Sequence, residues 1–171
     1  MLNIDRLVNQ VIPYPDDYEH REGFNNEYLI DQLNSETKEL LADGLLEKLS
    51  QRSDDLLIVN TLGYMKSKKA IEPLQKLLEE STEDTRRICI VSNLFKISPE
   101  KSFIEIASSS FENIIKLPMN YPYNRSTLIN SFYYMVTFKN EKINDLIKTF
   151  FTHADYLVSY NAKRSLGEIT D

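Results

Sequence analysis

The sequence predicts an all-α protein made of consecutive helix pairs, on three observations. Apolar residues recur at intervals of three and four along most of the chain, which is the spacing of one helix face. Sustained alternation of apolar and polar residues, which would indicate β-strands, is nearly missing. Similar helix endings also recur at intervals of roughly 32 to 40 residues, as in stacked repeats.

Four helices are expected in the first part of the chain. The first has an apolar face between Ile4 and Val11 and ends before Pro13, because proline removes a backbone hydrogen-bond donor. The polar, aromatic and acidic segment PYPDDYEHREG that follows is expected to be a loop. Ser35 is a suitable N-cap for the third helix. The four helices are expected over residues 4–11, 26–33, 35–49 and 54–65.

The next helix is expected over residues 67–78 and contains Pro73. A proline in a helix interior costs roughly 3 kcal/mol. This helix is therefore either kinked or begins closer to Pro73 than Ser67 suggests.

Five helices follow in the C-terminal half. Ser98 and Pro99 form a strong start signal, because serine caps a helix and proline fits its first turn. The serine run Ser108–Ser110 is a candidate break in that helix. Pro118 and Pro122 enclose a second aromatic loop, LPMNYPYN. The helices are expected over residues 83–97, from 98 onwards, 126–138, 141–151 and 155–169.

Two segments carry a family resemblance. The recurring helix endings are Leu62-Gly63, Leu94-Phe95, Tyr134-Met135 and Leu166-Gly167. The segment Leu62–Glu80, LGYMKSKKAIEPLQKLLEE, resembles the HEAT repeat, especially its short bacterial variety. The segment Ala162–Ile169 is similar to the end of the same repeat. The pairs that match in the first segment are Leu62-Gly63, Ala70-Ile71, Pro73-Leu74 and Leu77-Leu78.

The resemblance implies a fold and a task. It implies one domain, a right-handed α-α superhelix of about four HEAT-like helix pairs over residues 35–171. An N-terminal helical cap and acidic loop over residues 1–34 would precede these pairs. In this family Pro73 would stand in the first helix of a repeat, as a mild bend. The resemblance also implies binding as the usual task, with no inherited catalytic residues.

The composition argues against several functional classes. One cysteine and two histidines leave few ligands for a metal site, so we expect no metal and no cofactor. A net charge of −6 disfavours nucleic-acid binding, which needs clustered lysine and arginine. No apolar run approaches the roughly 20 residues of a membrane helix. The N-terminus lacks a signal-peptide pattern, so a cytoplasmic location without membrane attachment is expected.

Acidic residues are concentrated at one end of the chain. Residues 1–55 contain 13 acidic and 5 basic residues, whereas residues 56–171 contain 13 acidic and 15 basic ones. An electrostatic field of one sign accelerates association with a partner that carries the opposite charge. The asymmetry therefore favours a basic protein partner.

Tyrosine is the second indication of a binding surface. The chain has 10 tyrosines, and several lie in the two loops or on the second helices of pairs, which line the inner curve of HEAT superhelices. Tyrosine suits interfaces because it offers a large contact area and a hydrogen-bonding hydroxyl. The candidate partner-binding residues are Tyr14, Asp16, Asp17, Tyr18, Glu19, Tyr121, Tyr123, Tyr134, Tyr156 and Tyr160.

The function expected from these features is non-enzymatic protein binding. Its most concrete form is a bacterial immunity protein that binds and blocks a cognate toxin domain, an analogy based on the basic charge of many toxin domains. One alternative is a scaffold or regulatory subunit that docks on a larger enzyme. Another is a HEAT-like enzyme acting on nucleic acid or a tetrapyrrole, which would require a deep polar cleft and an acid of perturbed pKa.

Overall fold

The computed structural model describes residues 3–13, 26–52, 55–118 and 122–169. Regular structure in these residues is entirely helical, which confirms the predicted all-α class. The α-helices are α1 (Ile4–Val11), α3 (Glu27–Asp31), α4 (Ser35–Gln51), α5 (Leu56–Tyr64), α6 (Ile71–Glu80), α7 (Asp84–Ile97), α8 (Lys101–Ile114), α9 (Pro122–Met135), α10 (Glu141–Lys148) and α11 (Tyr156–Ser165). Three short 3-10 segments are η1 (Lys68–Ala70), η2 (Val136–Phe138) and η3 (Thr149–Thr152).

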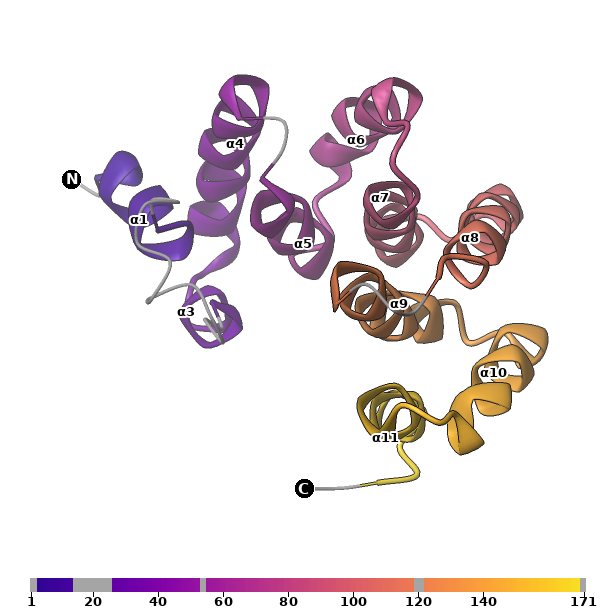
Figure 1. The fold of residues 1–171 in the computed structure, drawn as a ribbon. Coiled ribbons are helices and arrows are strands. Elements are labelled where there is room, and N and C mark those ends of the chain that lie inside the picture. The colour runs from indigo at the N-terminus through magenta and orange to yellow at the C-terminus, as the bar shows by residue number, and fades with distance from the viewer. Residues whose placement is uncertain (1–2, 14–25, 53–54, 119–121, 170–171) are drawn as a thin grey trace.

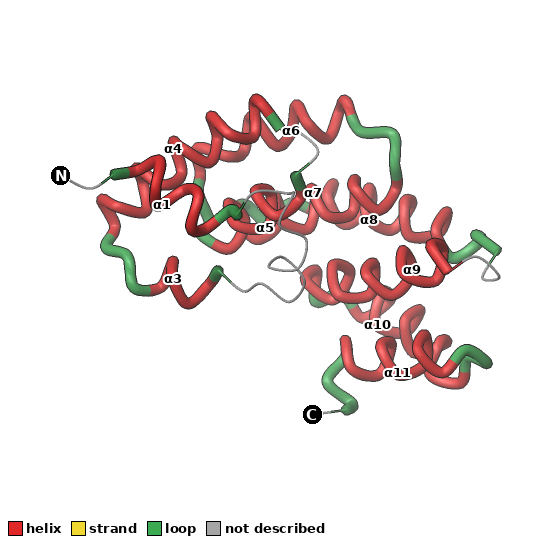
Figure 2. The backbone as a smooth tube through the Cα atoms, turned by 60° about the vertical axis from the view of Figure 1, so that its left-hand side comes forward, coloured by secondary structure: helices red, strands yellow, loops and turns green. Residues whose placement is uncertain are grey.

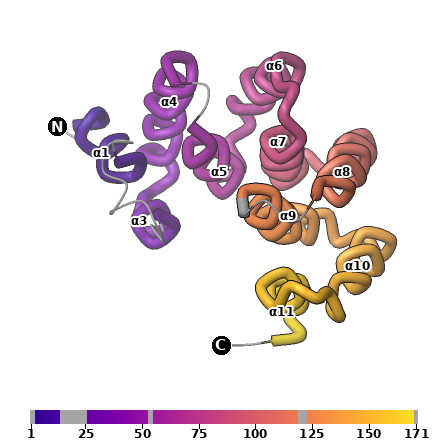
Figure 3. The backbone as a smooth tube through the Cα atoms, viewed as in Figure 1, coloured from indigo at the N-terminus to yellow at the C-terminus, as the bar shows by residue number. Residues whose placement is uncertain are grey.

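The helices follow an arc in two rows (Figure 1). The outer row consists of α4, α6, α8 and α10, and the inner row of α5, α7, α9 and α11. Figure 3 traces the chain around this arc, from α1 at the N-terminal end to α11 at the C-terminal end. Figure 2 gives the arc from another side, with only helices and loops in the described chain. The inner row therefore brings together helices that are separated in sequence by a helix of the outer row.

Asn26 anchors the N-terminal helices to the inner row. Its buried side-chain amide donates to the Val11 carbonyl over 3.1 Å and to the Thr61 hydroxyl over 2.7 Å. These bonds join the end of α1 and the start of α3 to α5. A buried amide is costly unless it is hydrogen-bonded, so this contact fixes the position of the segment.

Side-chain caps begin several of the helices. Asn34, rather than the expected Ser35, caps α4, because its Oδ1 accepts from the Thr37 N–H over 2.8 Å. Asp55 caps α5 in the same manner. Asparagine and aspartate at this position satisfy N–H groups that have no partner inside the helix.

Pro73 lies in the first turn of α6. Of the two expectations, a kinked helix or a helix that begins closer to Pro73, the second is therefore confirmed. The η1 turn takes up the chain before it, and α6 begins only at Ile71. First-turn residues have no partner for their N–H groups inside the helix, so proline loses no hydrogen bond there.

Two expectations for the C-terminal half are wrong. The helix α8 begins at Lys101 rather than at Ser98, because the Ser98 N–H donates back to the Leu94 carbonyl and ends α7. The serine run Ser108–Ser110 does not break α8. Its last member, Ser110, is only 3% exposed and faces the interior, whereas Ser109 is exposed, so the run continues the helix across both of its sides.

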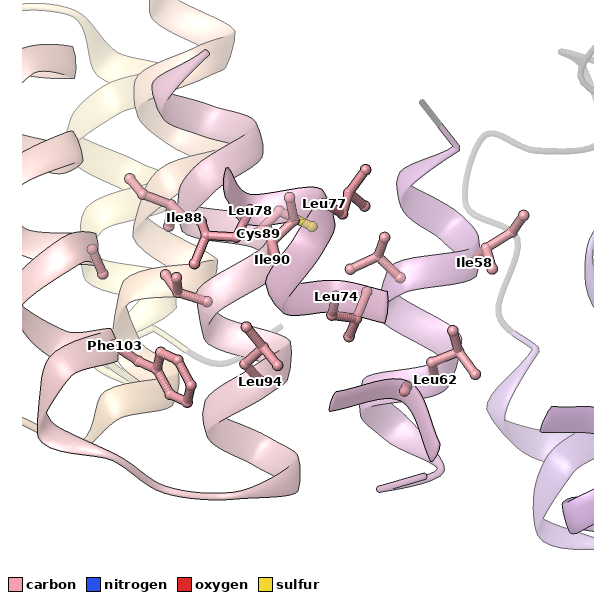
Figure 4. Packing of buried hydrophobic residues seen from close by; sticks show 14 of the residues in the cluster. Ile58, Leu62, Leu74, Leu77, Leu78, Ile88, Cys89, Ile90, Leu94 and Phe103 are labelled. Atoms are coloured by element: carbon pink, nitrogen blue, oxygen red, sulfur yellow. The ribbon is translucent and has the colours of Figure 1, made fainter. Parts of the chain in front are cut away.

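The helix α7 is the centre of the core. It packs against α5, α6, α8 and α9, and its residues from Ile88 to Leu94 are all buried. Figure 4 shows this packing, with Leu62 of α5, Leu74 of α6 and Phe103 of α8 around the α7 side chains. A helix buried on nearly all sides normally carries only apolar residues. The buried polar residues of α7, Ser92 and Asn93, therefore need hydrogen-bond partners. Asn93 and its partners form the first candidate site.

Candidate functional site

Asn93 of α7 is the centre of a buried polar cluster in the inner row. Its side chain is fully buried, and its amide donates to Asn60 Oδ1 of α5 and to the Cys89 carbonyl, both over 2.8 Å. Lys96 Nζ donates to Asn93 Oδ1 over 3.1 Å. The Asn93 amide thus has partners for both its oxygen and its nitrogen, as a buried amide requires.

The same cluster connects three inner helices. The Asn60 amide of α5 donates to the Tyr134 hydroxyl of α9 over 3.3 Å, across α7. The Cys89 thiol lies 3.5 Å from Asn60 Oδ1. Tyr134 is half-buried, so this candidate binding residue is held by hydrogen bonds inside the inner row.

The environment of this cluster shifts the pKa values of three groups. Burial raises the pKa of the Cys89 thiol to about 11. Burial, together with the neighbouring Cys89, raises the pKa of the Tyr134 hydroxyl above its ordinary value. Desolvation lowers the pKa of the Lys96 ammonium, against the opposing effects of Cys89 and Glu27. Cys89 is thus a neutral thiol at physiological pH, which does not suit a nucleophile.

Cys89 is therefore expected to resist alkylation in the folded protein. A pKa of about 11 leaves far less thiolate at pH 8 than an exposed cysteine has, so labelling should be slower by roughly a hundredfold or more. Reaction with iodoacetamide, followed by mass spectrometry of the intact chain, measures this rate. The chain unfolded in guanidinium is the control, and equally fast labelling of the folded and unfolded chain would contradict the buried position.

Tyr156 and Tyr160 form a second candidate site on α11. Their ring centroids are 5.9 Å apart, and Tyr156 is 72% exposed. Residues four apart share a helix side, and this side lies opposite the buried Val158 and Ala162. We call the side made by Tyr156, Tyr160, Lys163 and Arg164 the α11 face.

Two contacts hold α11 against α9 and fix the orientation of the α11 face. The Tyr133 hydroxyl of α9 donates to Asn161 Oδ1 over 2.7 Å. Arg125 of α9 pairs with Asp155, the N-cap of α11, over 3.3 Å. Burial disfavours ionised Asp155, but hydrogen bonds from the Val158 N–H and Arg125 outweigh this and lower its pKa. These contacts therefore fix α11 relative to α9.

The candidate residues from the sequence are only partly brought together. Tyr156 and Tyr160 are adjacent on α11, whereas Tyr134 belongs to the Asn93 cluster. Tyr123 is 72% exposed but lies in the first turn of α9, not in the expected loop, because α9 already begins at Pro122. The candidates outside the described residues are Tyr14, Asp16, Asp17, Tyr18, Glu19 and Tyr121.

Sequence reasoning missed Asn60, Asn93, Lys96 and Tyr133. One signal was present, because Asn93 interrupts the apolar run ICIVSNLF at a position that faces the core. A polar residue at such a position is informative, since it must find a partner when buried.

Among the described residues, a pocket of about 460 Å³ lies between α8 and α10. Ile104, Phe111 and Leu146 contribute apolar surface to it, and Glu105 and Glu112 lie among its polar residues. In the described part of the chain, no group of three histidine, cysteine, aspartate or glutamate side chains is placed to hold a metal ion. No helix in that part is long and apolar enough to cross a bilayer.

Comparisons with known proteins found no matching family model, no matching curated protein and no matching solved structure.

Proposed function

We propose that the chain is a right-handed superhelix of four HEAT-like helix pairs that binds a protein partner without catalysis. The pairs would be α4–α5, α6–α7, α8–α9 and α10–α11, with one helix of each pair in each row. In such repeat proteins each unit packs only on its neighbours, and the curved inner surface serves for binding.

The observation that carries the proposal is the exposed tyrosine surface on the inner row. Tyr156 is 72% exposed and Tyr133 is 40% exposed, on the two last inner helices. Exposed tyrosine is favoured at interfaces, because its rigid ring buries much area with little loss of side-chain entropy. Both side chains leave part of their ring surface outside the core, and a partner would bury this exposed surface.

The finer form of the proposal is an immunity protein whose partner is a basic toxin domain. Its support is the acidic composition of residues 1–55. Acidic residues of the described part of this segment, such as Asp31 and Glu36, are exposed on α3 and α4. Such a field would raise the association rate with a cationic domain and would weaken as salt is added.

Replacing Tyr156 and Tyr160 by alanine together is expected to weaken partner binding by about thirtyfold or more, the effect of losing one interface hot spot. The partner would first be enriched from the native host with the tagged chain and identified by mass spectrometry. Calorimetry with the purified partner would then compare wild type with Y156A/Y160A.

Tyr28→Ala is the matched control, because Tyr28 is 73% exposed but lies on α3 at the other end of the chain. Equal affinities of Y156A/Y160A and wild type would contradict the proposed surface. A partner other than a toxin would contradict the immunity form alone. For a toxin partner, alanine at Asp16, Asp17 and Glu19 should slow association at low salt.

A further inference from the structure

The pocket between α8 and α10, two helices of the outer row in Figure 1, has an apolar base and polar walls. Phe111 and Ile143 line it and are buried, and the half-buried Ile104 and Leu146 add apolar surface. We call this pocket of about 460 Å³ the α8–α10 groove. The polar side chains that line it include Ser108, Ser109, Glu112 and Lys142.

Glu112 and Lys142 place opposite charges on the two walls of this groove. Glu112 belongs to α8 and Lys142 to α10, and both residues are exposed. Among the residues that the structure describes, neither makes an ion pair or a side-chain hydrogen bond. Glu105, a further carboxylate of the groove, already pairs with Lys101 over 3.6 Å, so the available charges are one carboxylate and one ammonium.

The positions of these two charges are unfavourable for their own helices. Glu112 lies in the last turn of α8, and Lys142 lies in the first turn of α10. The helix dipole favours cations in a last turn and anions in a first turn, by about 0.3–1 kcal/mol each. A contribution to helix stability therefore does not explain either charge, whereas complementary charges on a bound partner would compensate for both positions.

We infer that the α8–α10 groove binds a short segment of a protein partner in which an aliphatic or aromatic side chain lies between a cation and a carboxylate. The apolar side chain would enter the groove against Ile104 and Leu146. The cation would pair with Glu112 and the carboxylate with Lys142, so the two charges would fix the direction of the segment. This site is separate from the proposed function, which concerns the inner row.

The length of the groove limits the size of that segment. Its α8 wall extends from Ile104 to Glu112, eight positions or about 12 Å along the helix axis. An extended chain advances about 3.3 Å per residue, so about four residues span this wall. The hydroxyls of Ser108 and Ser109 belong to the same wall and can donate to, or accept from, the main chain of the segment. Each charge of the segment is therefore expected within three positions of the apolar side chain.

A protein segment fits these charges better than the other occupants do. A nucleic acid presents phosphates, which Glu112 would repel. A free apolar amino acid carries its ammonium and its carboxylate on one carbon atom, whereas Glu112 and Lys142 belong to different walls. A second copy of the chain is the remaining occupant to be tested.

The test selects random twelve-residue peptides displayed on phage against the full chain. Counter-selection on Glu112→Lys/Lys142→Glu (E112K/K142E), which exchanges the two charges, removes peptides that bind elsewhere. We expect the remaining peptides to carry an aliphatic or aromatic residue with a lysine or arginine on one side and an aspartate or glutamate on the other. Fluorescence anisotropy of the most enriched peptide should show about tenfold weaker binding to E112K/K142E. The same peptide with its two charges exchanged should bind E112K/K142E more tightly than wild type.

Two controls accompany these measurements. Lys76→Glu/Glu80→Lys (K76E/E80K) makes the same exchange at a pocket between α4 and α6, also in the outer row, and should leave binding unchanged. E112K/K142E should unfold at the same temperature as wild type or above it, because each charge then lies at the favourable end of its helix. Circular dichroism during heating measures this temperature. Should E112K/K142E not fold, Glu112→Gln and Lys142→Gln replace it, each expected to weaken binding about threefold.

The inference is overturned if no peptide is enriched, if the peptides lack one of the two charges, or if E112K/K142E and wild type bind equally. Competition by free leucine at millimolar concentration would assign the groove to a small zwitterion instead. A concentration-dependent dimer that E112K/K142E abolishes would assign it to a second copy of the chain. Equal weakening by Y156A/Y160A would place the peptide on the inner row. None of these results contradicts the proposed function, whose test uses the tyrosines of the inner row.

Discussion

Replacing Gly63 by alanine is expected to destabilise the protein by about 2–3 kcal/mol, the upper part of the range for overpacked cores. A Cβ atom at this position would lie 2.1 Å from Asn93 Oδ1 and 2.6 Å from Asn93 Cβ. The Cβ of Asn93 is fixed to the α7 backbone and cannot rotate away. The helices α5 and α7 would have to separate, and the Asn60–Asn93 hydrogen bond would weaken with them.

Two other glycines, Gly44 and Gly167, provide matched controls for this substitution. At Gly44 an added Cβ would lie 2.7 Å from Cγ2 of the buried Val8, so α1 would have to shift slightly, and this cost opposes the gain of about 1 kcal/mol from the higher helix propensity of alanine. At Gly167 the space is open but φ is +77°, so alanine should cost roughly 1 kcal/mol through the backbone alone. Urea denaturation of the three variants measures the differences.

A small effect at Gly63, equal to that at Gly44, would show that α5 and α7 do not approach as closely as described. A double variant separates the two clashes. Asn93→Ala removes the Oδ1 contact but keeps the Cβ contact, so it should restore only part of the stability lost in Gly63→Ala.

Gly63 also illustrates how far the sequence predicts this fold. Leu62-Gly63 is predicted to end a helix, and α5 does end one residue later, at Tyr64. Helix ends depend on local signals such as prolines and caps, so most helices are predicted close to their positions. The reason for glycine at this site is the approach of Asn93, which is 30 positions further along the chain. That contact depends on how α5 and α7 stack, which no local pattern encodes.

In the candidate sites, too, the sequence predicts what depends on spacing within one helix, but not what depends on how the helices stack. Tyr156 and Tyr160 can be placed on one side of a helix from their spacing of four, and they are adjacent in the structure. Tyr134 is also on an inner helix as expected, but its hydroxyl is bound to Asn60. Its role depends on three helices meeting, so periodicity within α9 alone could not distinguish it from the more exposed Tyr133.

Replacing Phe132 by alanine is expected to cost about 3–5 kcal/mol, the usual loss for a buried phenylalanine. Phe132 of α9 is fully buried, and its ring packs 6.1 Å from Phe111 of α8 and 5.3 Å from Phe150 of η3. The ring therefore connects α9 to the helix before it and to the segment after it. A cavity there would weaken the stacking on both sides.

The helices that lose protection in Phe132→Ala are as informative as the size of the stability loss. If the helices form stacked repeats, stability is a sum of local and neighbour terms, so damage at Phe132 should remain mostly in α8–α11. Hydrogen exchange with mass spectrometry should show lost protection there and retained protection in α4 and α5. Tyr133→Ala is the control on the same helix, because it removes one partly exposed ring and its bond to Asn161, worth about 1 kcal/mol. Equal loss of protection across all helices in Phe132→Ala would mean that the chain unfolds as one unit. The α11 face would then depend on the whole arc rather than on its last two pairs.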